Sequence, residues 1–260
     1  MIVSTDAIIL RVFRYSDSSK IVRMYTRDRG KLSALAKGAM RGKLRFGATL
    51  DPMSYVHVVL YLKEARELQT LTQCDFVKPF RALTDDVEKM AAGMAVVELL
   101  DGVTHSQEQN EGLFALAVRT LETLNSATKG GGLALYFYEM RLLEIVGFKP
   151  NVHSCEHCGT ALTEELIAQP GGELRLTHSG VVCGRCSSLH KGLLPVSPPA
   201  LRVLQRLQEV SDPEMVTRFV LTTIVRGEVA SALRRFLMLH VEGLRALKSE
   251  AVFASFSETH

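Results

Sequence analysis

The chain has 260 residues, of which 47% are hydrophobic and 23% are charged. This composition is typical of an ordered globular protein that is long enough for two domains, or for one domain with a small insertion. No apolar run approaches the roughly 20 residues that a membrane-spanning helix needs, and residues 1–6 lack the basic and apolar regions of a signal peptide. We therefore expect a cytoplasmic protein with no membrane segment.

The net charge of +3 hides an asymmetry along the chain. Residues 1–80 contain fourteen Lys and Arg against seven Asp and Glu, whereas the remaining 180 residues contain seventeen against twenty-one. This asymmetry predicts that any binding of a polyanion lies in the first third of the chain.

Residues 1–80 contain five runs rich in β-branched, aliphatic and aromatic residues, at 7–13, 21–27, 31–37, 55–62 and 68–77. Asp28-Arg29-Gly30 predicts a short hairpin loop between the second and third runs, and residues 38–52 form a longer connection. Five short strands with one long connection between the third and fourth predict a Greek-key barrel of the OB type. A small antiparallel sandwich fits almost as well.

Basic side chains dominate residues 20–45, where nine Lys and Arg accompany a single acid, Asp28. On an extended second strand, Val22 and Met24 point to one face while Arg23, Tyr25 and Arg27 point to the other. Cations that neutralise phosphates, beside an exposed ring on which a base can stack, are typical of a nucleic-acid surface. An ordinary solvated charged edge is the alternative. The predicted nucleic-acid-binding residues are Arg23, Tyr25, Arg27, Arg29, Lys31, Lys37, Arg41, Lys43, Arg45 and Phe46.

From residue 84 the hydrophobic period changes from 2 to about 3.6. Apolar stripes within residues 90–100 and 113–124 predict two amphipathic helices, and a third over 133–146 is stopped by Gly147 and Pro150. Helix returns after Ser197-Pro198-Pro199, and a stripe from Val229 to Leu244 predicts a long last helix.

Four of the five cysteines form two pairs, Cys155-Glu156-His157-Cys158 and Cys183-Gly184-Arg185-Cys186. Each C-x-x-C turn points two thiolates at a common centre, and two such pairs complete a tetrahedron around a zinc ion. We predict one structural zinc per chain on Cys155, Cys158, Cys183 and Cys186, because four thiolates leave no open position for water or substrate. Disulfides would need an oxidising compartment, and a redox C-x-x-C does not normally come twice. Nearby histidines are alternative ligands, although solvated loop residues are the simpler interpretation, and Cys74 is predicted to be an ordinary apolar residue.

These elements together predict an α+β protein. Its expected parts are an OB-fold domain at residues 1–80, a helical domain in two stretches at 81–150 and 195–250, an inserted zinc-binding module at 151–194 and a C-terminal tail at 251–260. No catalytic residue is predicted. The stretch from Gly38 to Leu44 is one residue short of a phosphate-binding loop and lacks its hydroxyl, and neither a His-Glu-x-x-His helix nor a Gly-x-Ser-x-Gly elbow is present.

Several short stretches, in the order in which they occur, resemble the RecO family of bacterial recombination mediators. They span nearly the whole chain: Asp6 to Leu10, Gly30 to Leu32, Ala36 to Ala39, Arg45 to Gly47, Leu50 to Pro52, Arg141 to Leu143, and Gly147 to Pro150 ahead of Cys155.

This resemblance implies a protein that acts without catalysing a reaction. It also implies a cytoplasmic protein that associates with the nucleoid. The family binds single-stranded and double-stranded DNA, anneals complementary strands, and works with RecR to load RecA onto DNA coated by single-stranded-DNA-binding protein; RecF is a further candidate partner. The basic positions above match the family's DNA-binding region. Two alternatives stay open. One is an RNA-binding factor with an OB barrel and a zinc ribbon, and the other is a zinc-dependent enzyme that modifies nucleic acid, which the lack of a carboxylate cluster in the basic segment disfavours.

Overall fold

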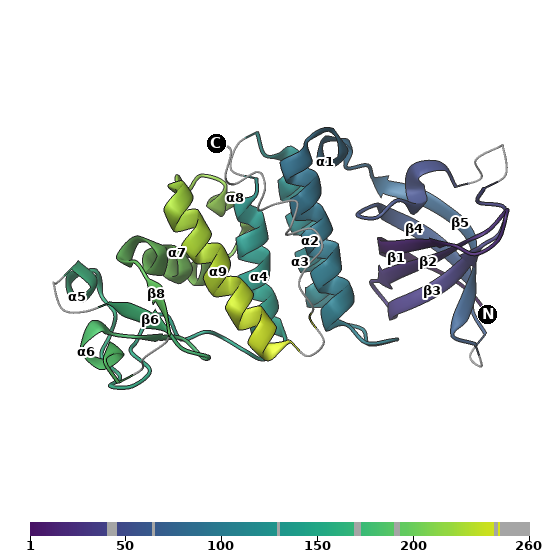
Figure 1. Ribbon diagram of the computed structural model, residues 1–260. Coiled ribbons are helices and arrows are strands. Elements are labelled where there is room, and N and C mark those ends of the chain that lie inside the picture. Colours follow the sequence, from purple (N-terminus) through teal and green to yellow (C-terminus); the bar gives the residue numbers. More distant parts are fainter. Residues whose placement is uncertain are drawn as a thin grey trace. The chain divides into compact units, whose positions relative to one another are not determined.

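A computed structural model describes residues 1–40, 46–63, 66–128, 131–168, 173–189, 193–241 and 244 (Figure 1). The chain divides into two compact units between Gly132 and Leu133. The first unit contains the β-strands of residues 1–80 and the first three α-helices, and the second contains the remaining helices together with the paired cysteines.

Five strands close into a barrel in the order β1-β2-β3-β5-β4. Neighbouring strands are antiparallel except β3 and β5, which pair in parallel. The predicted OB-type barrel is confirmed, and the alternative of a small antiparallel sandwich is wrong because the five strands close into one barrel. The short 3₁₀ helix η1 (Gly47–Leu50) lies in the long connection before β4, and the strands are β1 (Ile2–Arg14), β2 (Lys20–Thr26), β3 (Gly30–Ala36), β4 (Tyr55–Tyr61) and β5 (Leu68–Lys78).

Alternate side chains of the strands fill the barrel with small and branched apolar groups, as the period of two requires. Ala7 and Ile9 of β1 meet Val22 and Met24 of β2 in this core. Cys74 belongs to the same core, and its burial raises the pKa of the thiol to about 11. The prediction that Cys74 is an ordinary apolar residue is confirmed.

Strand β1 contains a bulge between Ile9 and Arg11, where its pairing with β2 shifts. Ile9 lies inside the barrel, whereas Leu10 is buried outside the barrel core and Arg11 reaches a helix on the outer wall. A bulge inserts one extra residue into one strand and so re-aims the side chains that follow. Beyond it Val12 packs against the barrel core, which leaves Phe13 on the outer wall.

Three helices complete the first unit: α1 (Arg81–Asp85), α2 (Val87–Val103) and α3 (Glu111–Ser126). Asp86 and Asn110 cap α2 and α3 by accepting hydrogen bonds from the backbone N–H groups of Lys89 and Leu113. Helices α2 and α3 pack against each other, and α2 also packs on β1 (Figure 1). One part of the outer barrel wall is therefore covered by helices.

The second unit contains a group of helices and a small β-module. Helix α4 (Leu133–Ile145) packs against α7 (Pro198–Glu209), α8 (Pro213–Val216) and α9 (Thr223–His240). The module consists of α5 (Glu164–Ala168), α6 (Gly184–Ser187) and a three-stranded sheet in the order β7-β6-β8, with β6 (Leu174–Leu176), β7 (Val181–Val182) and β8 (Leu194–Val196). Helices occur where the hydrophobic stripes predicted them, except that the last one ends at His240 and does not extend to Leu244. The domain boundaries expected from the sequence stay a prediction. None of the helices within the described ranges is both long and apolar enough to cross a membrane.

Gly30 offers a test of how the barrel meets the segment between α2 and α3. It has a φ of +63°, and a Cβ added there would overlap the backbone carbonyl of Glu108. We predict that Gly30→Ala lowers the free energy of unfolding by about 3 kcal/mol, since a left-handed backbone costs about 1–2 kcal/mol and overpacking adds a similar amount. Urea denaturation measures the loss.

The matched control is Gly38→Ala. Gly38 has a φ of +75°, but no atom of the described residues lies within 4 Å of its added Cβ, so only the backbone cost of about 1–2 kcal/mol is expected. Equal losses in the two variants would contradict the close approach of the 105–110 segment to β3.

Candidate nucleic-acid interface and metal centre

One buried carboxylate joins helix α2 to three cations from the barrel wall. The Asp101 oxygens lie 2.8 Å from Arg11 Nε, 3.3 Å from Arg23 Nη1 and 3.2 Å from Lys31 Nζ. Lys31 also donates to the backbone carbonyl of Asp101 at 2.6 Å, which is one of the carbonyls that the end of α2 leaves without a helical partner. Strands β1, β2 and β3 each supply one cation, so this cluster fixes the helix on all three.

The cluster keeps a positive excess, because one carboxylate faces three cations. Asp101 is only 7% exposed, whereas the side chains of Arg11 and Arg23 are 45% and 38% exposed. The two guanidinium groups therefore keep donors that face solvent, and Arg presents five donors in a planar fork that suits phosphate. The Lys31 side chain is only 18% exposed, and its ammonium group is bound to Asp101, so it offers little to a ligand.

The prediction that Tyr25 offers an exposed ring is wrong. Tyr25 is fully buried, with its ring 6.4 Å from that of Phe114 on α3. Its hydroxyl donates to the carbonyl of Glu108 and accepts from the N–H of Asn110, and burial raises the pKa of the phenol. Tyr25 does lie on the outer face of β2 as alternation predicted, but α3 and the segment before it cover that face.

The other predicted residues fall into four groups. Phe46 is buried in the barrel core, so it too offers no exposed ring. Arg27 pairs with Asp6 at 3.2 Å and lies 5.4 Å from the Phe114 ring. Arg29 and Lys37 are exposed, and neither forms an ion pair among the residues that the structure describes. Arg41, Lys43 and Arg45 lie outside the described residues.

The exposed aromatic residues of this region lie elsewhere, at Phe13 and Tyr15, which are 43% and 59% exposed. Simple alternation from Ile9 would place Phe13 in the core, and the bulge turns it outward. The one signal in the sequence is Arg11, a charged residue in phase with Ala7 and Ile9, since a cation at a core position argues for a shift of register.

Several cations lie at the same end of the paired strands β1, β2 and β3 as these aromatic residues. In the strand register, Arg14 of β1 is opposite Lys20 of β2, and Lys20 is opposite Ala36 of β3, which Lys37 follows in the chain. The Met40 N–H donates to the carbonyl of Ser18, so the basic connection that continues at Arg41 begins beside the β1–β2 turn. Among the described residues, Asp17 pairs with Arg14 of this group at 3.1 Å and the buried Asp101 pairs with Arg11 and Arg23. We call this group the basic surface; its described cations are Arg11, Arg14, Lys20, Arg23 and Lys37.

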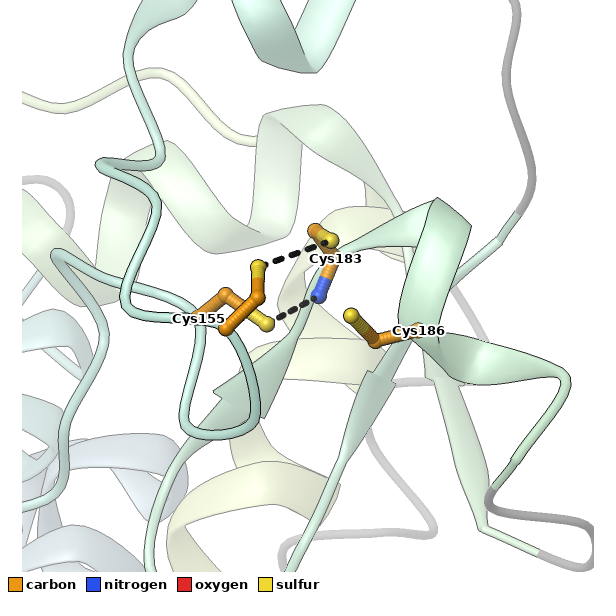
Figure 2. Close-up of side chains that lie close together, drawn as sticks. Cys155, Cys183 and Cys186 are labelled. Carbon is orange, nitrogen blue, oxygen red and sulfur yellow. Dashed lines mark hydrogen bonds between the residues drawn. The ribbon is translucent and has the colours of Figure 1, made fainter.

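The two cysteine pairs come together in the β-module of the second unit. The four Sγ atoms of Cys155, Cys158, Cys183 and Cys186 all lie within 4.8 Å of one another. The N–H of Cys183 donates to Cys155 Sγ at 3.2 Å, and the Sγ atoms of Cys158 and Cys183 are 3.9 Å apart (Figure 2). The arrangement brings together two turns that are far apart in sequence, as the spacing predicted.

The chemistry of this donor set fits a metal ion such as zinc. Hydrogen bonds with Thr160 lower the pKa of Cys158 to about 6, while burial among the other sulfurs raises the pKa of Cys186 to about 12. Four thiolates at such short range repel one another unless a cation lies between them, and a thiolate ligand set suits soft-tolerant zinc. All four predicted ligands are therefore brought together, and the cluster could hold one ion.

Comparison with known proteins covers nearly the whole chain. Residues 1–80 match the family model described as Recombination protein O N terminal, and residues 84–251 match Recombination protein O C terminal. The chain is 32% identical to a DNA repair protein RecO from Salinibacter ruber over 97% of this chain and 94% of that protein. It is 31% identical to a DNA repair protein RecO from Symbiobacterium thermophilum over 95% of this chain and 94% of the relative. A third DNA repair protein RecO, from Chloroherpeton thalassium, is 29% identical over 97% of this chain and 98% of that protein.

We predict that Asp101→Asn lowers the free energy of unfolding by about 2 kcal/mol. Removing one partner from a buried ion cluster costs about 3–5 kcal/mol, and the partial exposure of Arg11 and Arg23 reduces that cost. Thermal or urea denaturation measures the change.

Asp17→Asn is the matched control, since Asp17 is fully exposed and, among the described residues, forms its ion pair with Arg14. Its loss should stay below about 0.5 kcal/mol, the usual value for a surface pair. Similar small losses in both variants would contradict the role given to Asp101.

Proposed function

The chain belongs to the RecO family of recombination proteins and thus has a role in DNA repair and recombination, and we propose that it acts there by binding DNA without catalysing a reaction. The observation that carries this proposal is the basic surface of the barrel. Its five described cations face one exposed acid, Asp17, and one buried acid, Asp101. Such an excess favours a polyanion, because binding releases the counterions condensed on the nucleic acid.

The proposed mechanism of strand annealing is electrostatic. Two complementary strands repel each other through their phosphates, and a cationic surface screens that repulsion while it leaves base edges free to pair. Arg11 and Arg23 suit this role since Asp101 holds one side of each guanidinium and leaves the rest toward solvent. No nucleotide hydrolysis is needed, so annealing should proceed without ATP.

Family membership also supports a set of partners for the proposed activity. We propose that the protein binds both single-stranded and double-stranded DNA, works with RecR, and helps to load RecA onto DNA coated by single-stranded-DNA-binding protein, with RecF as a further candidate. With such partners, we expect the protein to act at the nucleoid in the cytoplasm. The proposal assigns no described residue to a protein partner.

The basic surface also bears on the two alternative functions. A nuclease would need carboxylates to hold its metal near the phosphates, whereas Asp101 is buried and already bound by three cations. Asp17, the other acid of the described surface, pairs with Arg14. An RNA-binding role would show as a preference for RNA over DNA strands of the same sequence, which a direct competition measures.

We predict that replacing Lys20 and Lys37 by Ala weakens DNA binding for every sequence alike. Both lysines belong to the basic surface, and losing two phosphate contacts should flatten the slope of log K against log salt by about 1.4 for single strands. Fluorescence anisotropy with labelled oligonucleotides at several salt concentrations measures both quantities.

The matched control removes the same charge from the second unit, at the exposed residues Arg202 and Arg218. This variant should bind with nearly the parent affinity and slope. If the control loses as much as the Lys20 and Lys37 variant, the binding site is not on the barrel.

We further propose that the metal is zinc, one ion per chain, with a structural role. Four thiolate ligands leave no open coordination position, and metal binding of this kind contributes directly to folding. Protein purified under reducing conditions should contain one zinc per chain by elemental analysis, Cys155→Ser should lose it, and Cys74→Ala should keep it. Chelation should expose the β-module to protease and leave α4, α7 and α9 protected. Absence of stoichiometric metal in the parent protein would contradict this proposal.

A further inference from the structure

Phe13 is an exposed aromatic residue on the two strands that carry most of the basic surface. Exposed apolar side chains are common on protein surfaces and need no special explanation. The Phe13 ring, however, lies 5.8 Å from the guanidinium carbon of Arg23, in the range of a cation–π contact. Arg11 pairs with Arg23 on the outer face that carries Phe13, and Arg14 and Lys20 follow at the same end of these two strands, so an exposed ring and a set of cations lie together at one end of the barrel.

The placement of this ring is fixed by neighbouring structure. The bulge in β1 turns Phe13 out of the barrel, and Arg23, which approaches its ring, is itself held by the buried carboxylate of Asp101 at 3.3 Å. Ring and guanidinium are thus ordered before a ligand arrives. Preorganised groups bind more tightly because less conformational entropy is lost on binding.

We propose that Phe13 is a stacking residue for the unpaired bases of single-stranded DNA, with the exposed Tyr15, two residues later in the chain, as a second ring. This inference rests on the proposed DNA binding and adds to it a preference for strand type. Every base has a π-face, so stacking tolerates any sequence, whereas the bases inside a duplex are already stacked on one another. The cations hold the backbones of both forms, and the ring adds affinity for single strands alone.

The first experiment separates stacking from charge. Phe13→Ala removes no charge but removes the stacking ring, so it should weaken binding of a single-stranded oligonucleotide about 10-fold, which corresponds to about 1.4 kcal/mol. The slope of log K against log salt should not change. Affinity for the duplex of the same sequence, and for an abasic strand that has phosphates but no bases, should stay within about 2-fold of the parent.

The second experiment uses the absence of tryptophan from the whole chain. In Phe13→Trp the single indole should be quenched as single-stranded DNA is added, with the same midpoint as anisotropy, and binding should be retained. Tyr61→Trp is a matched control, since the Tyr61 ring is 41% exposed and lies 5.8 Å from Lys63 Nζ, but it pairs with Ile2 at the other end of β1. The control indole should change little.

The outcomes distinguish this inference from the function on which it rests. If the parent binds DNA with the expected salt dependence but Phe13→Ala binds single strands equally well, the stacking role is wrong and the proposed function stands. Equal losses for single strand, duplex and abasic strand, or equal quenching at positions 13 and 61, would also overturn it. A parent protein that does not bind DNA would overturn both.

Discussion

The first unit depends on the burial of one carboxylate between a helix and three strands. Arg11, Arg23 and Lys31 come from β1, β2 and β3, and they would repel one another if Asp101 did not lie among them. The carboxylate is itself stable in a buried position only because these cations surround it. The interaction is therefore mutual, and it sets where α2 lies on the barrel. Once α2 is placed, α3 packs beside it and covers Tyr25.

The same interaction decides which part of the strand surface remains available to a ligand. On β2, Tyr25 lies under α3 while Arg23, two residues earlier, is partly exposed at the edge of the covered area. Beyond that edge the outer wall carries Phe13 and the cations of the basic surface. Helices α2 and α3 thus divide the outer face of the barrel strands into two parts. Under the helices the rings of Tyr25 and Phe114 pack together, and outside them the Phe13 ring remains exposed.

Local patterns predicted the elements well, and long-range packing explains what they missed. Alternation and turn residues predicted the five strands, and the C-x-x-C spacing predicted four cysteines that lie together. The burial of Tyr25 depends on Asn110, 85 residues later in the chain, and no local period reports such a contact. The bulge shifted the phase of β1 at a single residue, with Arg11 as its only local sign. Asp101 follows Leu99 and Leu100 on a buried part of α2. Because a carboxylate is rarely buried without a partner, its position in the sequence already indicated that cations pair with it.

A surface that combines cations with a ring binds through two physically separable contributions. Phosphate contacts weaken as salt rises, because counterions compete for the backbone, whereas base stacking depends little on ionic strength. Cations alone would bind a duplex at least as well as a single strand, since the duplex has the higher charge density. An exposed ring raises the affinity for single strands relative to duplex, because it can stack on unpaired bases. Once these bases pair with a complementary strand, they can no longer stack on the ring. A duplex is then bound through its phosphates alone. Such a surface therefore binds the single strand, the reactant of annealing, through a stacking contact that the duplex product lacks.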